Sequence, residues 1–242
     1  MNFTYETYRE MLKLLQEKGY AITNYHEFLD CKRCVILRHD IDSDIAQAVR
    51  MAEVEAACGV RSTYFVLLRT GFYNPAFAPA LAKLHRIQEL GHELGLHFDE
   101  AAYPIGTPEE TAGRILQERD ILSLILKTPV TTVSMHRPSR ATLEANLRIP
   151  GMVNSYGQTF FHNFKYLSDS RRRWREPVAD IICGGIYDRL HILTHPFWYH
   201  DEDQTQEQCV SDFVNNANRQ RYAMFKENIT DLEAIMKESE VR

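Results

Sequence analysis

Four segments of the sequence, far apart along the chain, carry side chains that could bind a metal ion or move a proton. The first contains Asp40 and Asp42, and the others contain His97, His136 and His195. Carboxylates and imidazoles are common protein ligands of zinc and similar ions, and both groups also act as general acids and bases. Together these residues predict a hydrolytic metal site, provided that the fold brings the four segments together.

The acidic pair lies in the segment RHDID, with one residue between the two carboxylates. Residues two apart in an extended chain point to the same side, so Asp40 and Asp42 can face one cavity. Two carboxylates so close repel each other unless a cation lies between them or one is protonated. We therefore expect one of them to bind a divalent ion and the other to act as a base. Capping of the following helix, the alternative role, is assigned to Ser43 or Asp44.

The remaining sequence alternates short apolar runs with segments of helical spacing, without a linker or repeat. Strands are predicted near 35–37, 62–68, 93–96, 131–135, 152–156 and 189–194. Helices are predicted at about 5–18, 44–57, 76–90, 107–126 and 206–237. Strands separated by helices pair in parallel, and the carboxyl ends of parallel strands share the face where barrel enzymes build their sites. Because each chemically active segment directly follows a strand candidate, we predict one α/β barrel-like domain over residues 1–242.

Composition excludes several classes of protein. The chain has 242 residues, 44% of them hydrophobic and 25% charged, which is typical of a soluble globular protein with a full core. A net charge of -5 predicts no nucleic-acid partner. No apolar run is long enough to span a membrane, and the first residues do not resemble a secretion signal. Five scattered cysteines indicate a reducing compartment, so we expect a cytoplasmic protein.

The order of these motifs resembles that of the polysaccharide deacetylases, the carbohydrate esterases of the fourth family, which share a distorted, TIM-like (β/α)7 barrel. The segment RHDID is similar to a variant of their first motif in which one residue separates the acids. The resemblance implies that Asp40 is the catalytic base and Asp42 a metal ligand. The segment GHELGLH is similar to the family's GHEIGNH, which implies that its last residue, His97, is the first metal histidine.

Three later motifs extend the resemblance. The family's Arg-Pro motif matches at Arg137, which we expect to orient Asp40 by a charge-assisted bond. The Leu-His-Pro motif matches at THP, which implies that His195 is the general acid. An acid near a tryptophan corresponds loosely to Asp169 and Trp174, which we expect to bind substrate, with the indole against a sugar ring. The alternative for these two residues is a loop packed on the barrel rim.

One position departs from the family pattern. The second metal histidine of the family lies four residues after the first, where this chain has Ala101. His136 is the best candidate to replace it, and Asp99 and Glu100 are weaker ones. With zinc as the expected ion, the predicted ligands are Asp42, His97 and His136.

The resemblance implies a metal-dependent hydrolase that removes an acetyl group from an N-acetylated sugar or glycan precursor, a non-peptide carbon–nitrogen bond. The chain also resembles a bacterial subgroup linked to O-antigen and surface-glycan synthesis, which fits the expected cytoplasmic location. Two alternatives stay open: a metal-dependent amidohydrolase of a small non-sugar amide, and a catalytically inactive glycan-binding barrel, suggested by Ala101. A glycosidase is disfavoured, because Asp40 and Asp42 are too close for the roughly 5 Å or more that its paired carboxylates need.

Overall fold

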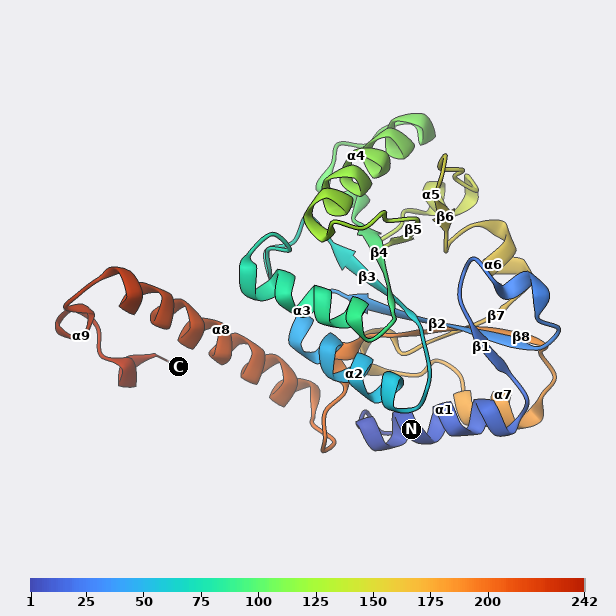
Figure 1. Ribbon diagram of the computed structural model, residues 1–242, viewed down its shortest axis with the longest axis horizontal. Coiled ribbons are helices and arrows are strands. Elements are labelled where there is room, and N and C mark those ends of the chain that lie inside the picture. The colour runs from blue at the N-terminus through green and yellow to red at the C-terminus, as the bar shows by residue number, and fades with distance from the viewer. Residues whose placement is uncertain (242) are drawn as a thin grey trace. The chain divides into compact units, whose positions relative to one another are not determined.

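The protein is described by a computed structural model over residues 1–241, which form two compact units, Met1–Glu202 and the residues from Asp203 onward. The first unit contains eight strands (Figure 1). In chain order they are β1 (Ala21–Thr23), β2 (Cys34–Ile41), β3 (Thr63–Leu67), β4 (Glu93–Phe98), β5 (Thr132–Met135), β6 (Val153–Asn154), β7 (Lys165–Ser168) and β8 (Arg189–Thr194).

Seven of these strands form one sheet in the order β6-β5-β4-β3-β2-β8-β7, and every pairing is parallel. The short β1 pairs with the beginning of β2, on the edge that β3 uses farther along the same strand. Because β6 and β7 are the two ends of this order, the barrel is open between them. The predicted α/β class and the distorted, seven-stranded parallel barrel are confirmed.

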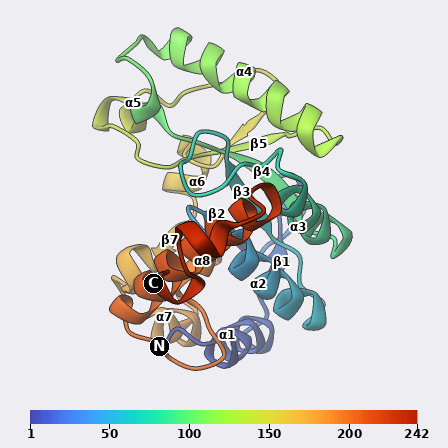
Figure 2. The same ribbon diagram turned by 90° about the vertical axis from the view of Figure 1, so that its left-hand side faces the viewer.

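Helices connect the strands and cover the outside of the sheet. They are α1 (Tyr5–Glu17), α2 (Ile45–Ala57), α3 (Ala78–Glu89), α4 (Pro108–Leu126), α5 (Arg140–Glu144), α6 (Gln158–His162) and α7 (Val178–Gly184). The first four helices of the chain, α1 to α4, lie side by side in that order (Figure 2). Asp44 caps α2 by accepting a bond from the backbone N–H of Ala46, as predicted, which leaves the two preceding aspartates free for other roles.

All eight residues of β2 are buried, and their side chains alternate between the two faces of the sheet. Val35 and Leu37 pack outward into the hydrophobic cluster that includes α1. Cys34 and Ile36 belong to a second cluster, with aromatic residues of β3 and α6. The same alternation places the next residues of the strand, Arg38 and Asp40, inward, and His39 outward.

The second unit contains α8 (Gln206–Asn228) and α9 (Leu232–Ile235). A capping box at Thr205 and Gln208 begins α8, and Tyr222 of this helix donates a hydrogen bond to the carbonyl of Met236. The prediction that residues 1–242 form a single domain stays a prediction. Of the helices in residues 1–241, none has the length and apolar composition needed to cross a membrane.

Candidate functional site

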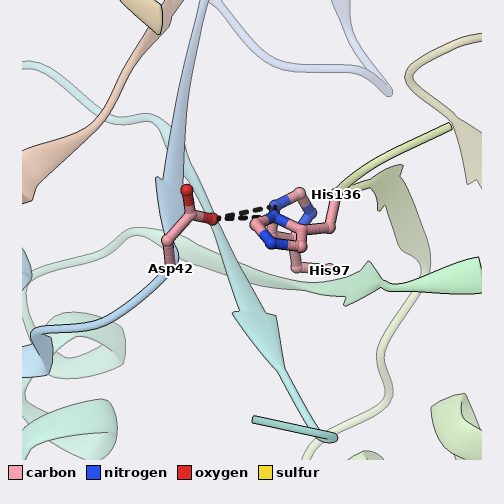
Figure 3. A group of neighbouring side chains, drawn as sticks. All are labelled: Asp42, His97 and His136. Atoms are coloured by element: carbon pink, nitrogen blue, oxygen red, sulfur yellow. Dashed lines mark hydrogen bonds and ion pairs between the residues drawn. The ribbon is translucent and has the colours of Figure 1, made fainter. Parts of the chain in front are cut away.

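Three predicted metal ligands converge at the carboxyl ends of neighbouring strands. Asp42 follows β2, His97 is the fifth residue of β4, and His136 follows β5. Asp42 Oδ1 lies 3.2 Å from His97 Nε2 and 3.1 Å from His136 Nδ1. The two ring nitrogens are 3.2 Å apart. Figure 3 shows the carboxylate of Asp42 directed at both rings, as the sequence prediction required.

This arrangement fits a divalent ion. Ligand atoms about 2.0–2.2 Å from a zinc ion are roughly 3.0–3.5 Å from one another, close to the separations here. Asp42 Oδ1 is buried and makes no well-aligned hydrogen bond to either imidazole, although it lies between them. One carboxylate oxygen and two imidazole nitrogens are a common zinc donor set. The three residues therefore form a candidate metal site (Figure 3).

The departure at Ala101 does not leave this set incomplete. Ala101 lies in a one-turn helix after β4, and its methyl group cannot bind a metal. The weaker candidates nearby are engaged elsewhere: Asp99 pairs with Arg137, and Glu100 accepts bonds from the residues that begin α5. The third candidate ligand, His136, thus follows the next strand of the sheet, β5.

The predicted base, Asp40, is held by Arg38, which points to the same side of β2 two residues earlier. Arg38 Nε donates to Asp40 Oδ1 at 2.8 Å, and Nη2 donates to Oδ2 at 2.7 Å. Burial on its own would raise the pKa of Asp40, but the guanidinium, with help from His97, holds that pKa below its ordinary value. Asp40 Oδ2 lies 3.4 Å from His97 Nε2. Asp40 is therefore an ionised, oriented carboxylate beside the candidate metal site.

The arginine that contacts Asp40 is Arg38 and not Arg137, which corrects the sequence prediction. Arg137 lies beyond the end of β5, and its Nη2 donates to Asp99 Oδ2 at 2.5 Å. The side chain of Arg137 is 63% exposed, so it belongs to the rim and not to the interior. The segment RHDID was enough to predict the contact between Arg38 and Asp40, because residues two apart in a strand share a face.

His195 and the buried Asp169 form a hydrogen-bonded pair next to this cluster. His195 Nδ1 donates to Asp169 Oδ1 at 2.6 Å, and the backbone N–H of His195 lies 3.1 Å from both carboxylate oxygens. Burial alone would lower the pKa of His195, but Asp169 raises it to about 9. Its other ring nitrogen, Nε2, lies 3.8 Å from Asp42 Oδ2. A protonated imidazole beside the candidate metal site can act as a general acid.

The two predicted substrate-binding residues have other places in the structure. Asp169 is fully buried and serves His195, so it has no face for a substrate. Trp174 is half-buried and packs on the hydrophobic cluster formed by α1, α7 and the outer face of β2. The burial of its indole agrees with the alternative of a loop packed on the barrel.

No protein-family model matches the sequence, and no curated protein matches it. Solved structures do match. The peptidoglycan deacetylase PdaC from Bacillus subtilis is 15% identical over 85% of this chain and 98% of its own, with a TM-score of 0.46. The Streptococcus pyogenes deacetylase PplD is 14% identical over 58% of this chain and 66% of its own, with a TM-score of 0.44. A CE4 family pseudoenzyme from Bacillus anthracis is 13% identical over 77% of this chain and 62% of its own, with a TM-score of 0.47.

These structures are similar to the chain in fold, at low identity. The chain spans less than two thirds of the length of the last two. Similarity of fold alone says nothing of chemistry. The chemistry of this chain has to be argued from its own side chains.

Proposed function

We propose that the protein is a metal-dependent hydrolase that removes the acetyl group from an N-acetylated sugar or glycan precursor. One observation carries this proposal: the three ligand atoms of Asp42, His97 and His136 converge next to an ionised carboxylate, Asp40, and a protonated imidazole, His195. Hydrolysis of an amide needs a base for the attacking water and an acid for the departing amine, both close to the reacting carbonyl.

Each group has a role that follows from its surroundings. A divalent ion held by the three ligands, for which we propose zinc, would polarise the amide carbonyl and make a water molecule more acidic. Asp40 takes the proton from the attacking water, and Arg38 keeps both of its oxygens in place. His195 delivers a proton from Nε2 to the departing amine, which leaves poorly as an anion. Asp169 fixes the ring of His195 through Nδ1 and favours its charged form.

The ligand set supports an active enzyme over an inactive barrel. Ala101 stands where the family has its second metal histidine. This change would disable the site only if no other residue supplied the third ligand. His136 supplies an imidazole nitrogen at 3.1 Å from Asp42 Oδ1 instead. The sugar substrate and the link to O-antigen or surface-glycan synthesis rest on the resemblance of the sequence motifs, and the proposed cytoplasmic location rests on the five scattered cysteines.

The experiment measures metal binding and acetate release separately. Zinc and cobalt titrations of the purified protein should show one tight site per chain. His136→Ala should weaken binding by more than the roughly 10–100-fold that loss of a supporting residue costs. His26→Ala is the matched control, because His26 is exposed and pairs with Glu93, away from the site. The metal-loaded protein should then release acetate from N-acetylglucosamine oligomers.

The two halves of the proposal can fail separately. Equal affinity of His136→Ala and the wild-type protein would reject the ligand set. Tight binding without acetate release from N-acetylated sugars would reject the substrate class and leave the metal site standing.

A further inference from the structure

A second cluster of ionisable side chains lies on the opposite face of β2, behind the candidate site. Its centre is Glu55 of α2, which is fully buried. The carboxylate accepts four hydrogen bonds, two on each oxygen: from Tyr8 at 2.7 Å, His39 Nε2 at 2.9 Å, Ser62 at 2.5 Å and Tyr64 at 2.8 Å. These donors come from α1, β2 and the chain at the start of β3. One buried carboxylate thus holds three elements together.

His39 connects this cluster to β8, the strand that pairs with β2. While Nε2 of His39 bonds Glu55, its Nδ1 lies 2.6 Å from Thr194 Oγ1. His39 and Thr194 are direct partners in the pairing of β2 with β8. Each of them is the neighbour in sequence of a proposed catalytic residue, Asp40 after His39 and His195 after Thr194.

The alternation of strand side chains turns this contact into a constraint on the site. A side chain fixed on the outer face commits its neighbours in the strand to the inner face, and a slip of one residue would reverse both. With His39 fixed outward, Asp40 faces inward beside Arg38. With Thr194 fixed outward at the end of β8, the chain enters His195 in the orientation that reaches Asp169.

We propose that Glu55 is a positioning residue, which acts through His39 and Thr194 to fix the strand ends that carry Asp40 and His195. The proposal rests on the proposed function for the roles of those two residues. Sheet hydrogen bonds set the spacing of β2 and β8, whereas the Glu55 cluster sets which side chains face the site. Displacement of a catalytic group by about 1 Å can cost on the order of 10² in rate.

Two variants and a control test this proposal. Glu55→Gln keeps the shape of the side chain and removes the charge that gathers the four donors. Thr194→Val keeps the shape of that residue and removes only the hydroxyl that meets His39. Glu118→Gln is the matched control, because Glu118 is also buried on a helix but accepts bonds from Tyr103 and Arg69, away from Asp40 and His195.

The first measurement needs no activity. The N–H proton shared by His195 and Asp169 lies in a short hydrogen bond to a fully buried carboxylate, so proton NMR of the metal-free protein should detect it. We expect both Glu55→Gln and Thr194→Val to shift or broaden this resonance and Glu118→Gln to leave it unchanged. Loss of stability alone, without displacement of His195, would not move it. If Glu55→Gln does not fold, Thr194→Val decides the outcome.

The second measurement compares two substrates of the metal-loaded protein. A misplaced acid should slow hydrolysis of an N-acetylated sugar by about tenfold or more relative to an aryl acetate, whose leaving group needs no proton. Unchanged resonance and an unchanged ratio of the two rates, in folded variants, would show that Glu55 is only structural. A wild-type protein that releases no acetate would contradict the proposed function, and the NMR measurement would still decide the positioning role.

Discussion

The two faces of β2 each carry a polar cluster with histidine beside a carboxylate, but the two carboxylates have different surroundings. The outer cluster gathers histidine, tyrosine and serine around Glu55, and each oxygen of that carboxylate accepts two hydrogen bonds. The inner cluster gathers histidine around Asp42, whose Oδ1 lies between two imidazoles without a well-aligned bond to either. Histidines near a carboxylate are therefore no sign of a metal site by themselves. What distinguishes the two clusters is whether the carboxylate already has its hydrogen-bond donors.

This difference predicts how each cluster contributes to stability and activity. A buried carboxylate with all of its donors in place is costly to disrupt, because its partners are left without it. A carboxylate that has an oxygen without a hydrogen-bond donor, next to imidazole nitrogens, is stabilised by a bound cation. The outer cluster should therefore govern stability and the placement of the strand ends, and the inner cluster should govern ion binding and proton transfer.

The largest expected effect is on catalysis. Asp40→Asn keeps the shape of the side chain but cannot take a proton, so turnover should fall by on the order of 10²–10⁴. Zinc affinity should stay near that of the wild type, because Asp40 is not a ligand. Acetate release and zinc titration of the variant, with folding checked by circular dichroism, measure both. A variant that loses its metal along with its activity would show that Asp40 and Asp42 do not divide these roles.

The next effect is on stability, in the outer cluster. Glu55→Ala removes the acceptor of four buried donors, and we expect the free energy of unfolding to fall by about 3–5 kcal/mol. Glu53→Ala on the same helix removes only surface ion pairs with Arg50 and Arg86 and should cost at most about 1 kcal/mol. Urea denaturation compares them. Similar losses in both variants would mean that the outer cluster is not the stabilising one.

A smaller effect should come from the ion. Zinc at about 100 times its dissociation constant should raise the free energy of unfolding by roughly 2.7 kcal/mol, because it binds only the folded state. Asp42→Asn should abolish this increase, whereas Thr194→Val, on the other face, should keep it. Thermal unfolding with and without zinc is the measurement. An increase that survives in Asp42→Asn would place the ion elsewhere.

The smallest effect concerns pH and a histidine that belongs to neither cluster. His191 of β8 is buried beside Tyr25, and burial, with Arg38, lowers its pKa to about 3. The folded protein keeps His191 neutral while the unfolded chain takes up a proton below about pH 6.5, so stability is full above that pH and falls as the pH drops toward 3. Between pH 7 and 5 this amounts to about 2 kcal/mol.

The comparison for this last effect is a pair of variants. His191→Phe should have a flatter dependence of stability on pH over this range than the wild type, and His26→Gln, at an exposed position, should not. Equal slopes in His191→Phe and the wild type would mean that His191 is already protonated in the folded protein.

The sequence predicted the barrel and most of the site because both depend on local patterns. Apolar runs identified β2, β3, β4, β5 and β8, and the residues after them came together as expected. The short β7 was missed, because its two half-buried residues followed by two buried ones give no alternation. Asp169 directly follows β7, so its place beneath His195 was missed with the strand.

Arg137 shows the limit of pattern and motif. Beyond a strand end, the direction of a long side chain depends on which carboxylate lies nearby, and here that carboxylate is Asp99. Arg38, inside the strand, is constrained by the pleat and could have been predicted to face Asp40. Side chains within strands follow from sequence far better than those in the loops after them.

The source of the third ligand has a consequence for folding. In the family pattern two histidines four residues apart share one segment, so a bound ion would link two stretches of chain. Here Asp42, His97 and His136 come from three stretches, each following or ending a different strand. An ion bound to all three would act as a double cross-link between residues distant in sequence, and cross-links that close long loops reduce the entropy of the unfolded chain the most. Refolding in the presence of zinc would then report on the assembly of β2, β4 and β5 together.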